Sequence, residues 1–403
     1  MATVRPFRAL RPRPDAVHLV ASPPYDVVST SEARALADGN GQSFLHVTRP
    51  EIDLPIGTDE HADAVYDKAR DNLEAFVSEG LLSQDSEPRL YLYAQRMGDH
   101  RQIGVVGCAS VREYDADRIK KHEKTRADKE DDRTRHIDTL SAHDEPVFLT
   151  YRADPKIDAL VKAAEGMMPA YDFETPDGVG HTFWALSPDD SRSLEAEFER
   201  IEALYVADGH HRSAAASRVH AKRKGDGGEH DVFLAVVFPH DQMQIMAYNR
   251  VVRDPKGRTG SQLLEALRER FDLEPADVPA PTRPKTFGLY VGGGKWWRAT
   301  PKTFDTSDPV RALDCSICQE QILGPELGIT DPRRDTHIEF VGGIRGHREL
   351  ERRVDSGEMT IAIYLYPTAI EELIAVSDAG LLMPPKSTWF EPKLRSGLFV
   401  HTF

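Results

Sequence analysis

Cysteine is scarce in this sequence, and it has no long apolar runs. Three cysteines among 403 residues cannot build a disulfide framework. No apolar stretch approaches the roughly 18 residues that a membrane-spanning helix needs. The N-terminal residues also lack the apolar core of a secretory signal peptide. We therefore expect a cytoplasmic protein that has no membrane partner.

Positive charge is also in short supply. The chain has 51 lysines and arginines against 66 aspartates and glutamates, which gives a formal net charge of −15. This excess of negative charge disfavours nucleic acids and anionic membranes as partners, unless a local basic patch overrides the average. Small metabolites are the partners that this composition favours.

Strand and helix patterns are mixed along the chain, and no internal repeat is present. They predict an α/β (α+β) fold with a mixed sheet. The polar stretch Lys256–Ser261 contains two glycines and is the predicted domain boundary. It divides the chain into a catalytic unit, residues 1–255, and a smaller C-terminal α+β domain, residues 256–403.

Periodicity and turn residues predict individual elements. A proline-rich arm at Pro6–Tyr25 should be irregular. The run Ile119–His143 is densely charged, and its composition favours a solvated, partly helical linker. Other predicted elements are the helices Ser31–Asp38, Glu60–Glu79 and Ala369–Ala379, a hairpin beginning at Arg89, and the strands Ala203–Ala207, Val232–Phe238 and Gln244–Val252.

The most specific local pattern is a strand that ends at Ala207, the turn Asp208–Arg212, and a helix at Ser213–Lys222. A helix that starts directly after a strand presents unpaired backbone N–H groups and the positive end of its dipole, which together attract phosphate. Gly209 lets the backbone approach a ligand, and Arg212 can bind two phosphate oxygens. His210 and His211 add further donors. The structural alternative is an N-capping Asp208 beside surface histidines.

Metal binding is a second interpretation of the histidines. The residues His122, Glu123, His136, His143, His210 and His211 offer zinc donors, although no HExxH spacing is present. Cys315 and Cys318 resemble half of a zinc ribbon. They fall on the apolar side of a predicted helix, however, which favours two core residues.

Two further segments carry residues suited to nucleotide chemistry. In the charged run, Glu123 could act as a base while Lys124 and Arg133 neutralise phosphate charge. Near the C-terminus, a proline-stiffened loop holds Lys386, Ser387 and Thr388. That loop could contact the catalytic face, and a purely structural clasp is an equal alternative.

Four segments together resemble a bacterial and archaeal family, the domain of unknown function 1015. They span most of the chain and occur in the family's order: Ser22–Val27, His122–Thr125, Ala207–Arg212 and Pro385–Lys393. The turn Asp208–Arg212 also resembles the nucleotide-binding turn of the ParB and sulfiredoxin superfamily, which includes free serine kinases. This resemblance implies a ParB/sulfiredoxin-like catalytic unit.

The kinase resemblance implies roles for particular residues. The matching positions Asp208, Gly209, His210, His211 and Arg212 would lie beside the phosphates or a metal. Glu123 would correspond to the acidic base that activates the serine hydroxyl, although it lies much farther from Asp208 in sequence than in the compact kinases. The implied catalytic residues are Glu123, Asp208 and His211, and the implied nucleotide-binding residues are Gly209, His210, Arg212, Lys124, Lys386, Ser387 and Thr388.

The expected activity is phosphoryl transfer from ATP or ADP to a small hydroxylated metabolite, with free L-serine as the leading acceptor. Mg²⁺ would be held by a carboxylate such as Asp208. A ParB-like nucleotide switch and a phosphohydrolase are the alternatives. If Glu123 is not the base, Asp208 or Asp26 takes that role. We also expect Lys386 to lie near Asp208, and an Arg212→Ala variant to keep its fold.

Overall fold

The computed structural model describes residues 2–223 and 227–403, which form two compact units. Unit 1 comprises Met1–Lys121, Thr125–Met243 and Pro392–Phe403, and unit 2 comprises His122–Lys124 and Gln244–Glu391. The contact boundary at Gln244 falls before the predicted division at residue 256. A division into separately folding domains stays a prediction.

Unit 1 is built on a mixed sheet that has nine strands in the described part of the chain. β12 is parallel to β8 and antiparallel to β5, and β11 is parallel to β6 and antiparallel to β8. The predicted α/β (α+β) class with a mixed sheet is thereby confirmed. In sheet order the strands are β6 (Ile119–Lys120), β11 (Leu204–Asp208), β8 (Val147–Tyr151), β12 (Val232–Pro239), β5 (His100–Ser110), β4 (Tyr91–Met97), β10 (Val179–Ala185) and β9 (Tyr171–Glu174), with β1 (Val4–Arg5) paired to β5.

The centre of this sheet is apolar on both faces. Every residue of β12 is buried, as expected for an interior strand. The large core around it includes Val105, Leu149, Phe198 and Phe233. The helices of unit 1 are α1 (Val17–Val20), α2 (Thr30–Ala37), α3 (Leu45–Thr48), α4 (Asp63–Ser78), α5 (Val111–Asp115), α6 (Ala127–Leu140), α7 (Pro155–Ala164), α8 (Pro188–Phe198) and α9 (His210–Arg223).

Local sequence explains where several helices begin. Ser29 caps α2 in a capping box with Glu32, as its sequence spacing predicts. α4 buries a stripe at helical spacing that includes Val65, Leu73 and Phe76. In the proline-rich arm, α1 has only four residues, and the strands β1 and β2 (Leu10–Pro12) have two and three.

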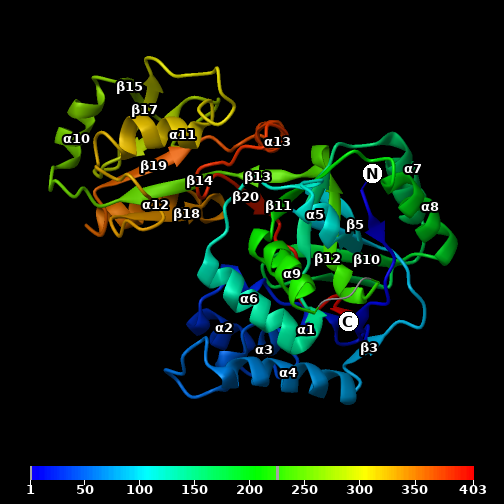
Figure 1. Cartoon of the computed structure of the whole chain (residues 1–403). Coiled ribbons are helices and arrows are strands. Elements are labelled where there is room, and N and C mark those ends of the chain that lie inside the picture. Colours follow the sequence, from blue (N-terminus) through cyan, green and yellow to red (C-terminus); the bar gives the residue numbers. More distant parts are fainter. Residues whose placement is uncertain (1, 224–226) are drawn as a thin grey trace. The chain divides into compact units, whose positions relative to one another are not determined.

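The charged run is partly helical, as expected, but its helix α6 is packed against other helices, so the interpretation as a solvated linker was wrong. α6 packs against α9 and α4, and Figure 1 shows it running between these two helices. Its charges are paired across the α6–α9 contact: Asp138 binds Lys222 at 2.5 Å and Arg223 at 2.8 Å. The composition suggested a solvated segment because it does not reveal that charged side chains of α6 are paired with those of α9 instead of with water.

Unit 2 has its own sheet, six-stranded in the described residues. α12 (Gly346–Asp355) packs on β14, β16 and β19 around Tyr290, Trp296 and Leu350. In sheet order the strands are β15 (Phe271–Ala276), β17 (Trp296–Pro301), β16 (Phe287–Tyr290), β19 (Ile361–Leu365), β14 (Tyr248–Val252) and β18 (Ile338–Gly342). The other elements are α10 (Gly260–Leu267), α11 (Asp314–Cys318), α13 (Ile370–Asp378), and β13 (Gln244–Met246) paired with β20 (Trp389–Glu391).

Two predictions about apolar segments can be compared with this structure. Cys315 and Cys318 are both buried in unit 2, as the core interpretation requires. Among the described residues, no helix has the length and apolar character needed to cross a bilayer.

Candidate functional site

The predicted order of strand, glycine and helix is present after β11, but α9 begins three residues before the predicted Ser213, so His210, His211 and Arg212 belong to its first turn. β11 carries an irregularity between Val206 and Asp208, after which Gly209 takes a φ of 92°. α9 then begins at His210. A Cβ on Gly209 would lie 3.1 Å from Cζ of Arg212, so both the positive φ and the close guanidinium favour glycine.

Asp208 is an ionised carboxylate at the end of β11. Its Oδ2 lies 2.9 Å from Nζ of Lys393, and its Oδ1 accepts a 2.8 Å hydrogen bond from the backbone N–H of Gly209. Burial alone would raise the pKa of Asp208, but the charges of Lys393 and Arg212 hold it well below its usual range. This residue is therefore suited to bind a cation and poorly suited to accept a proton.

Arg212 points inward from the first turn of α9. Its side chain is only 8% exposed, its Nη1 donates to the backbone oxygen of Pro146, and its Nη2 lies 3.9 Å from Oδ1 of Asp208. Burial opposes its charge, whereas the nearby carboxylates of Asp26, Asp208 and Glu145 raise its pKa. Arg212 thus has a structural role, whether or not it also binds a ligand.

Glu145 is a second buried acid beside this turn. Its Oε1 accepts hydrogen bonds from the backbone N–H of Tyr25 at 2.9 Å and from Oγ of Ser396 at 2.8 Å. Burial and the adjacent Asp144 raise the pKa of Glu145, although the charges of Arg212 and Arg133 oppose that shift. Its two hydrogen bonds join the proline-rich arm to the C-terminal segment of the chain.

Arg133 extends the cluster of cations from α6. Its Cζ lies 4.0 Å from the centre of the Tyr25 ring, and its Nη2 lies 2.8 Å from Asp132 Oδ2. Nη1 of Arg133 is buried and has no hydrogen-bond partner in the described part of the chain. A small cavity lies between Arg133, Arg212 and Glu145. The predicted cation Arg133 therefore lies with Arg212 on one side of unit 1.

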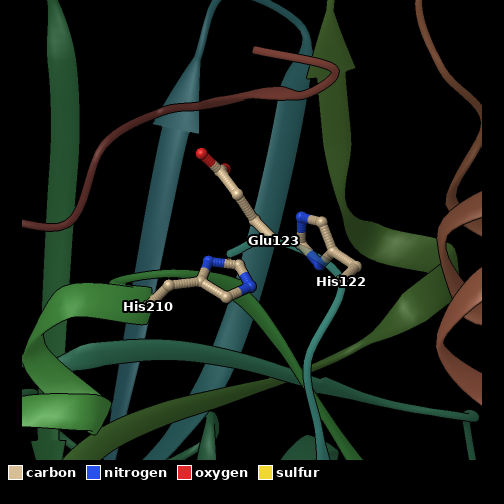
Figure 2. A group of neighbouring side chains, drawn as sticks. All are labelled: His122, Glu123 and His210. Carbon is tan, nitrogen blue, oxygen red and sulfur yellow. The ribbon is translucent and has the colours of Figure 1, made fainter. Parts of the chain in front are cut away.

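The other residues of the turn and of the segment before α6 have distinct surroundings. Nε2 of His211 accepts a 3.2 Å hydrogen bond from the backbone N–H of Arg126, which fixes the start of α6. Figure 2 shows His210 at the beginning of α9, and it shows the consecutive residues His122 and Glu123 with side chains that leave the chain in different directions. His122 is buried, Glu123 is half-buried and Lys124 is exposed.

The loop with Lys386, Ser387 and Thr388 is fastened within unit 2. Oγ of Ser387 donates to the backbone oxygen of Pro384 at 2.6 Å, and the backbone oxygen of Ser387 accepts from Thr368 at 2.8 Å. Lys386 is exposed, with Nζ 5.6 Å from the centre of the Tyr248 ring. These contacts are those of a structural clasp. A nucleotide-binding role for the loop stays a prediction.

Sequence reasoning did not select Lys393, Glu145 or Ser396 as site residues. Lys393 is the last residue of the fourth segment of the family resemblance. It lies in the same segment as Lys386, so the sequence offered equal grounds for selecting it. Glu145 and Ser396 carry no motif of their own. They lie together only because the proline-rich arm and the C-terminal segment meet at Glu145, and no local sequence pattern reveals that contact.

Comparison with protein families bears on these observations. The model of the family described as "Protein of unknown function (DUF1015)" matches residues 4–316. The chain belongs to this family. A search of the curated proteins found no match.

Several solved structures are similar in part. SbnI from Staphylococcus aureus with a C-terminal truncation aligns at a TM-score of 0.40, covering 73% of this chain and 87% of that one. A conserved hypothetical protein from Pyrococcus furiosus aligns at 0.36, covering 74% and 95%, and a free serine kinase in complex with AMP at 0.36, covering 71% and 86%. Each is 12% identical to this chain. TM-scores this low establish neither a shared fold nor a shared activity.

Proposed function

We propose that this protein transfers a phosphoryl group from ATP or ADP to the hydroxyl of a small metabolite. Free L-serine is the leading acceptor, on the resemblance of the turn Asp208–Arg212 to that of free serine kinases. The observation that supports the proposal most is the ionised Asp208 beside Lys393, at a glycine turn that leads into the N-terminus of α9.

The turn supports phosphate binding through both backbone and side chains. The first N–H groups of α9 and the positive end of its dipole suit an anionic oxygen. Lys393 and Arg212 can share their charge between Asp208 and a phosphate, because an ammonium group carries three donors and a guanidinium group five. His210, His211 and Lys124 are the further phosphate-side candidates.

Asp208 fits a magnesium ion by its chemistry. Mg²⁺ with a nucleotide is commonly held by one or two carboxylates together with phosphate oxygens. A carboxylate whose pKa lies well below its usual range stays anionic at neutral pH. Bound Mg²⁺ would neutralise phosphate charge, and Asp208 would contribute a carboxylate ligand.

Glu123 is the proposed base that receives the acceptor's hydroxyl proton. In the reaction the acceptor oxygen bonds to the terminal phosphorus of the nucleotide, and the bond from that phosphorus to the bridging oxygen breaks. ATP then leaves as ADP, or ADP as AMP. Asp208 is a weaker candidate for the base because of its low pKa, so exposed Asp26 is the better alternative.

Labelled nucleotide distinguishes this proposal from the two alternatives. The protein is incubated with Mg²⁺ and terminally labelled ATP or ADP, with and without L-serine, L-threonine or L-homoserine. Label on an acceptor indicates a kinase, and release of phosphate without an acceptor indicates a phosphohydrolase. Tight binding without turnover indicates a nucleotide switch, and either of these last two results contradicts the proposal.

A pair of lysine variants connects the result with the turn. We expect Lys393→Ala to reduce nucleotide affinity at least tenfold, because it removes the cation beside Asp208. Lys162→Ala is the matched control, since the side chain of Lys162 is 84% exposed on α7. Equal affinities in the two variants would contradict phosphate binding at Asp208.

A further inference from the structure

A second group of metal donors lies at the opposite end of α9 from Asp208. His220 belongs to the last turns of α9, and His230 and Asp231 belong to the short 3-10 helix Glu229–Asp231 that precedes β12. Ten residues of helix separate His220 from His210, which corresponds to about 15 Å at 1.5 Å per residue. The group is therefore separate from the proposed phosphate site.

The donor atoms of these three residues converge. Nδ1 of His220 lies 3.0 Å from Oδ1 of Asp231, and Nε2 of His230 lies 3.9 Å from the same oxygen. One donor atom from each residue lies within 4.8 Å of the others. Tetrahedral zinc with bonds of about 2.1 Å places its donors about 3.4 Å apart, so small side-chain shifts would complete the geometry.

The ion pair of His220 and Asp231 leaves the hydrogen-bonding capacity of its two atoms unsatisfied. Nδ1 of His220 and Oδ1 of Asp231 are both shielded from solvent, yet neither has a hydrogen-bond partner among the residues described. Two such atoms facing one another at 3.0 Å suit a shared cation better than a poorly aligned hydrogen bond.

The surroundings hold the donors in place. The backbone N–H of Gly227 donates to Oδ2 of Asp231 at 2.6 Å, which leaves Oδ1 turned toward the histidines. The ring of His230 lies over Gly228, where a Cβ would come within 2.4 Å of Cε1. All three side chains are less than one-fifth exposed.

We propose that His220, His230 and Asp231 bind one divalent transition-metal ion of the zinc class. The two imidazoles are borderline donors, and together with the harder carboxylate they favour Zn²⁺ over the hard cations Mg²⁺ and Ca²⁺. The ion fastens the C-terminal end of α9 to the residues before β12. This link between two segments is a structural role, and the site lies about ten helical residues from the turn proposed to bind phosphate.

Metal titration of the full-length chain tests this site without any assay of activity. The protein is stripped with a chelator, dialysed, and titrated with ZnSO₄ in the presence of excess Mg²⁺. We expect the wild type to bind one Zn²⁺ per chain and to have a higher melting temperature when it is loaded with zinc. The His230→Ala variant should lose this ion. Co²⁺ should give the strong visible absorption of four-coordinate nitrogen and oxygen ligation.

Matched variants decide the location. His230→Ala and the milder Asp231→Asn should each weaken this zinc binding at least tenfold, whereas His18→Ala, at an exposed histidine of α1, should not change it. If His230→Ala does not fold, Asp231→Asn carries the test. No zinc binding in the wild type, or binding that both site variants retain, would overturn the proposal.

Discussion

At the residue scale, the proposed base Glu123 can be distinguished from a binding residue by kinetics. A base acts as the acceptor hydroxyl loses its proton, so Glu123→Gln should lower kcat by about 10²–10⁴-fold and leave nucleotide affinity nearly unchanged. Steady-state rates and equilibrium titration measure the two quantities. A normal rate would refute the role, and a joint loss of rate and affinity that extra Mg²⁺ restores would indicate a metal ligand instead.

Arg212 combines a buried structural role with the proposed phosphate contact. Its removal would leave the Pro146 carbonyl without a donor and the nearby acids without a counter-charge, so Arg212→Ala should destabilise the fold by about 3 kcal/mol. The sequence-based expectation of an intact fold stays a prediction, and these buried contacts argue against it. Among molecules that remain folded, nucleotide affinity should fall at least tenfold.

Arg212→Lys and Arg192→Ala are the controls for this substitution. The lysine keeps the charge and should recover part of both losses, although it cannot make the forked contact. Arg192 is an exposed residue of α8 and its loss should have no effect on either quantity. Nucleotide affinity that stays normal in folded Arg212→Ala would exclude the phosphate contact.

Asp132 on α6 provides a test of pH dependence. Burial would raise its pKa, but Arg133 and the hydroxyl of Tyr66 lower it from 3.8 to about 2. A carboxylate whose pKa is lowered by folding stabilises the folded state when the pH is above its pKa in the unfolded chain. That stabilisation is lost as the pH falls through the pKa of the folded state. The contribution at neutral pH is roughly 2 kcal/mol.

The unfolding free energy of the wild type should exceed that of Asp132→Asn at neutral pH, and this difference should decrease in acid. It should be constant above about pH 5 and shrink between about pH 4 and pH 2. Denaturant titrations at several pH values measure it, with Asp189→Asn on α8 as the exposed control. A difference that grows as the solution becomes more acidic would contradict the assignment.

At the element scale, the junction of β11 and α9 depends on Gly209. Gly209→Ala forces a side chain into a φ of 92° and against the guanidinium of Arg212, so it should cost about 1–3 kcal/mol and weaken nucleotide binding. Gly178→Ala is the matched control, because it has a φ of 79° and open space for its Cβ. Equal losses of nucleotide affinity in both variants would argue against a special role for the β11–α9 junction.

Elements with a strong local pattern were predictable from sequence. The capping box at Ser29, the apolar stripe of α4 and the buried strand β12 follow directly from spacing and composition. α6 was not predictable in the same way, because Asp138, Lys222 and Arg223 are paired only once two helices meet. Charge alone does not reveal whether water or another helix will satisfy it.

At the scale of the whole molecule, long-range contacts limited the prediction of the site. The succession of β11, Gly209 and α9 is local and was predicted. Lys393 reaches Asp208 from 185 residues away in sequence, and Ser396 reaches Glu145 from 251 residues away. No periodicity or motif fixes such pairs, so these contacts needed the folded structure.

Phosphorus NMR of a single reaction tests the central claim most directly. Wild-type protein, Mg²⁺, ATP and L-serine are combined, and phosphoserine, ADP and inorganic phosphate are followed together, with Asp208→Asn as the site variant and Asp189→Asn as its control. Phosphoryl transfer predicts one phosphoserine for each ADP formed, little inorganic phosphate, and a large loss of rate in Asp208→Asn alone. With ADP as the donor, AMP should form in the same ratio. Phosphate release without phosphoserine, or no consumption of either nucleotide with any hydroxylated acceptor, would contradict the account.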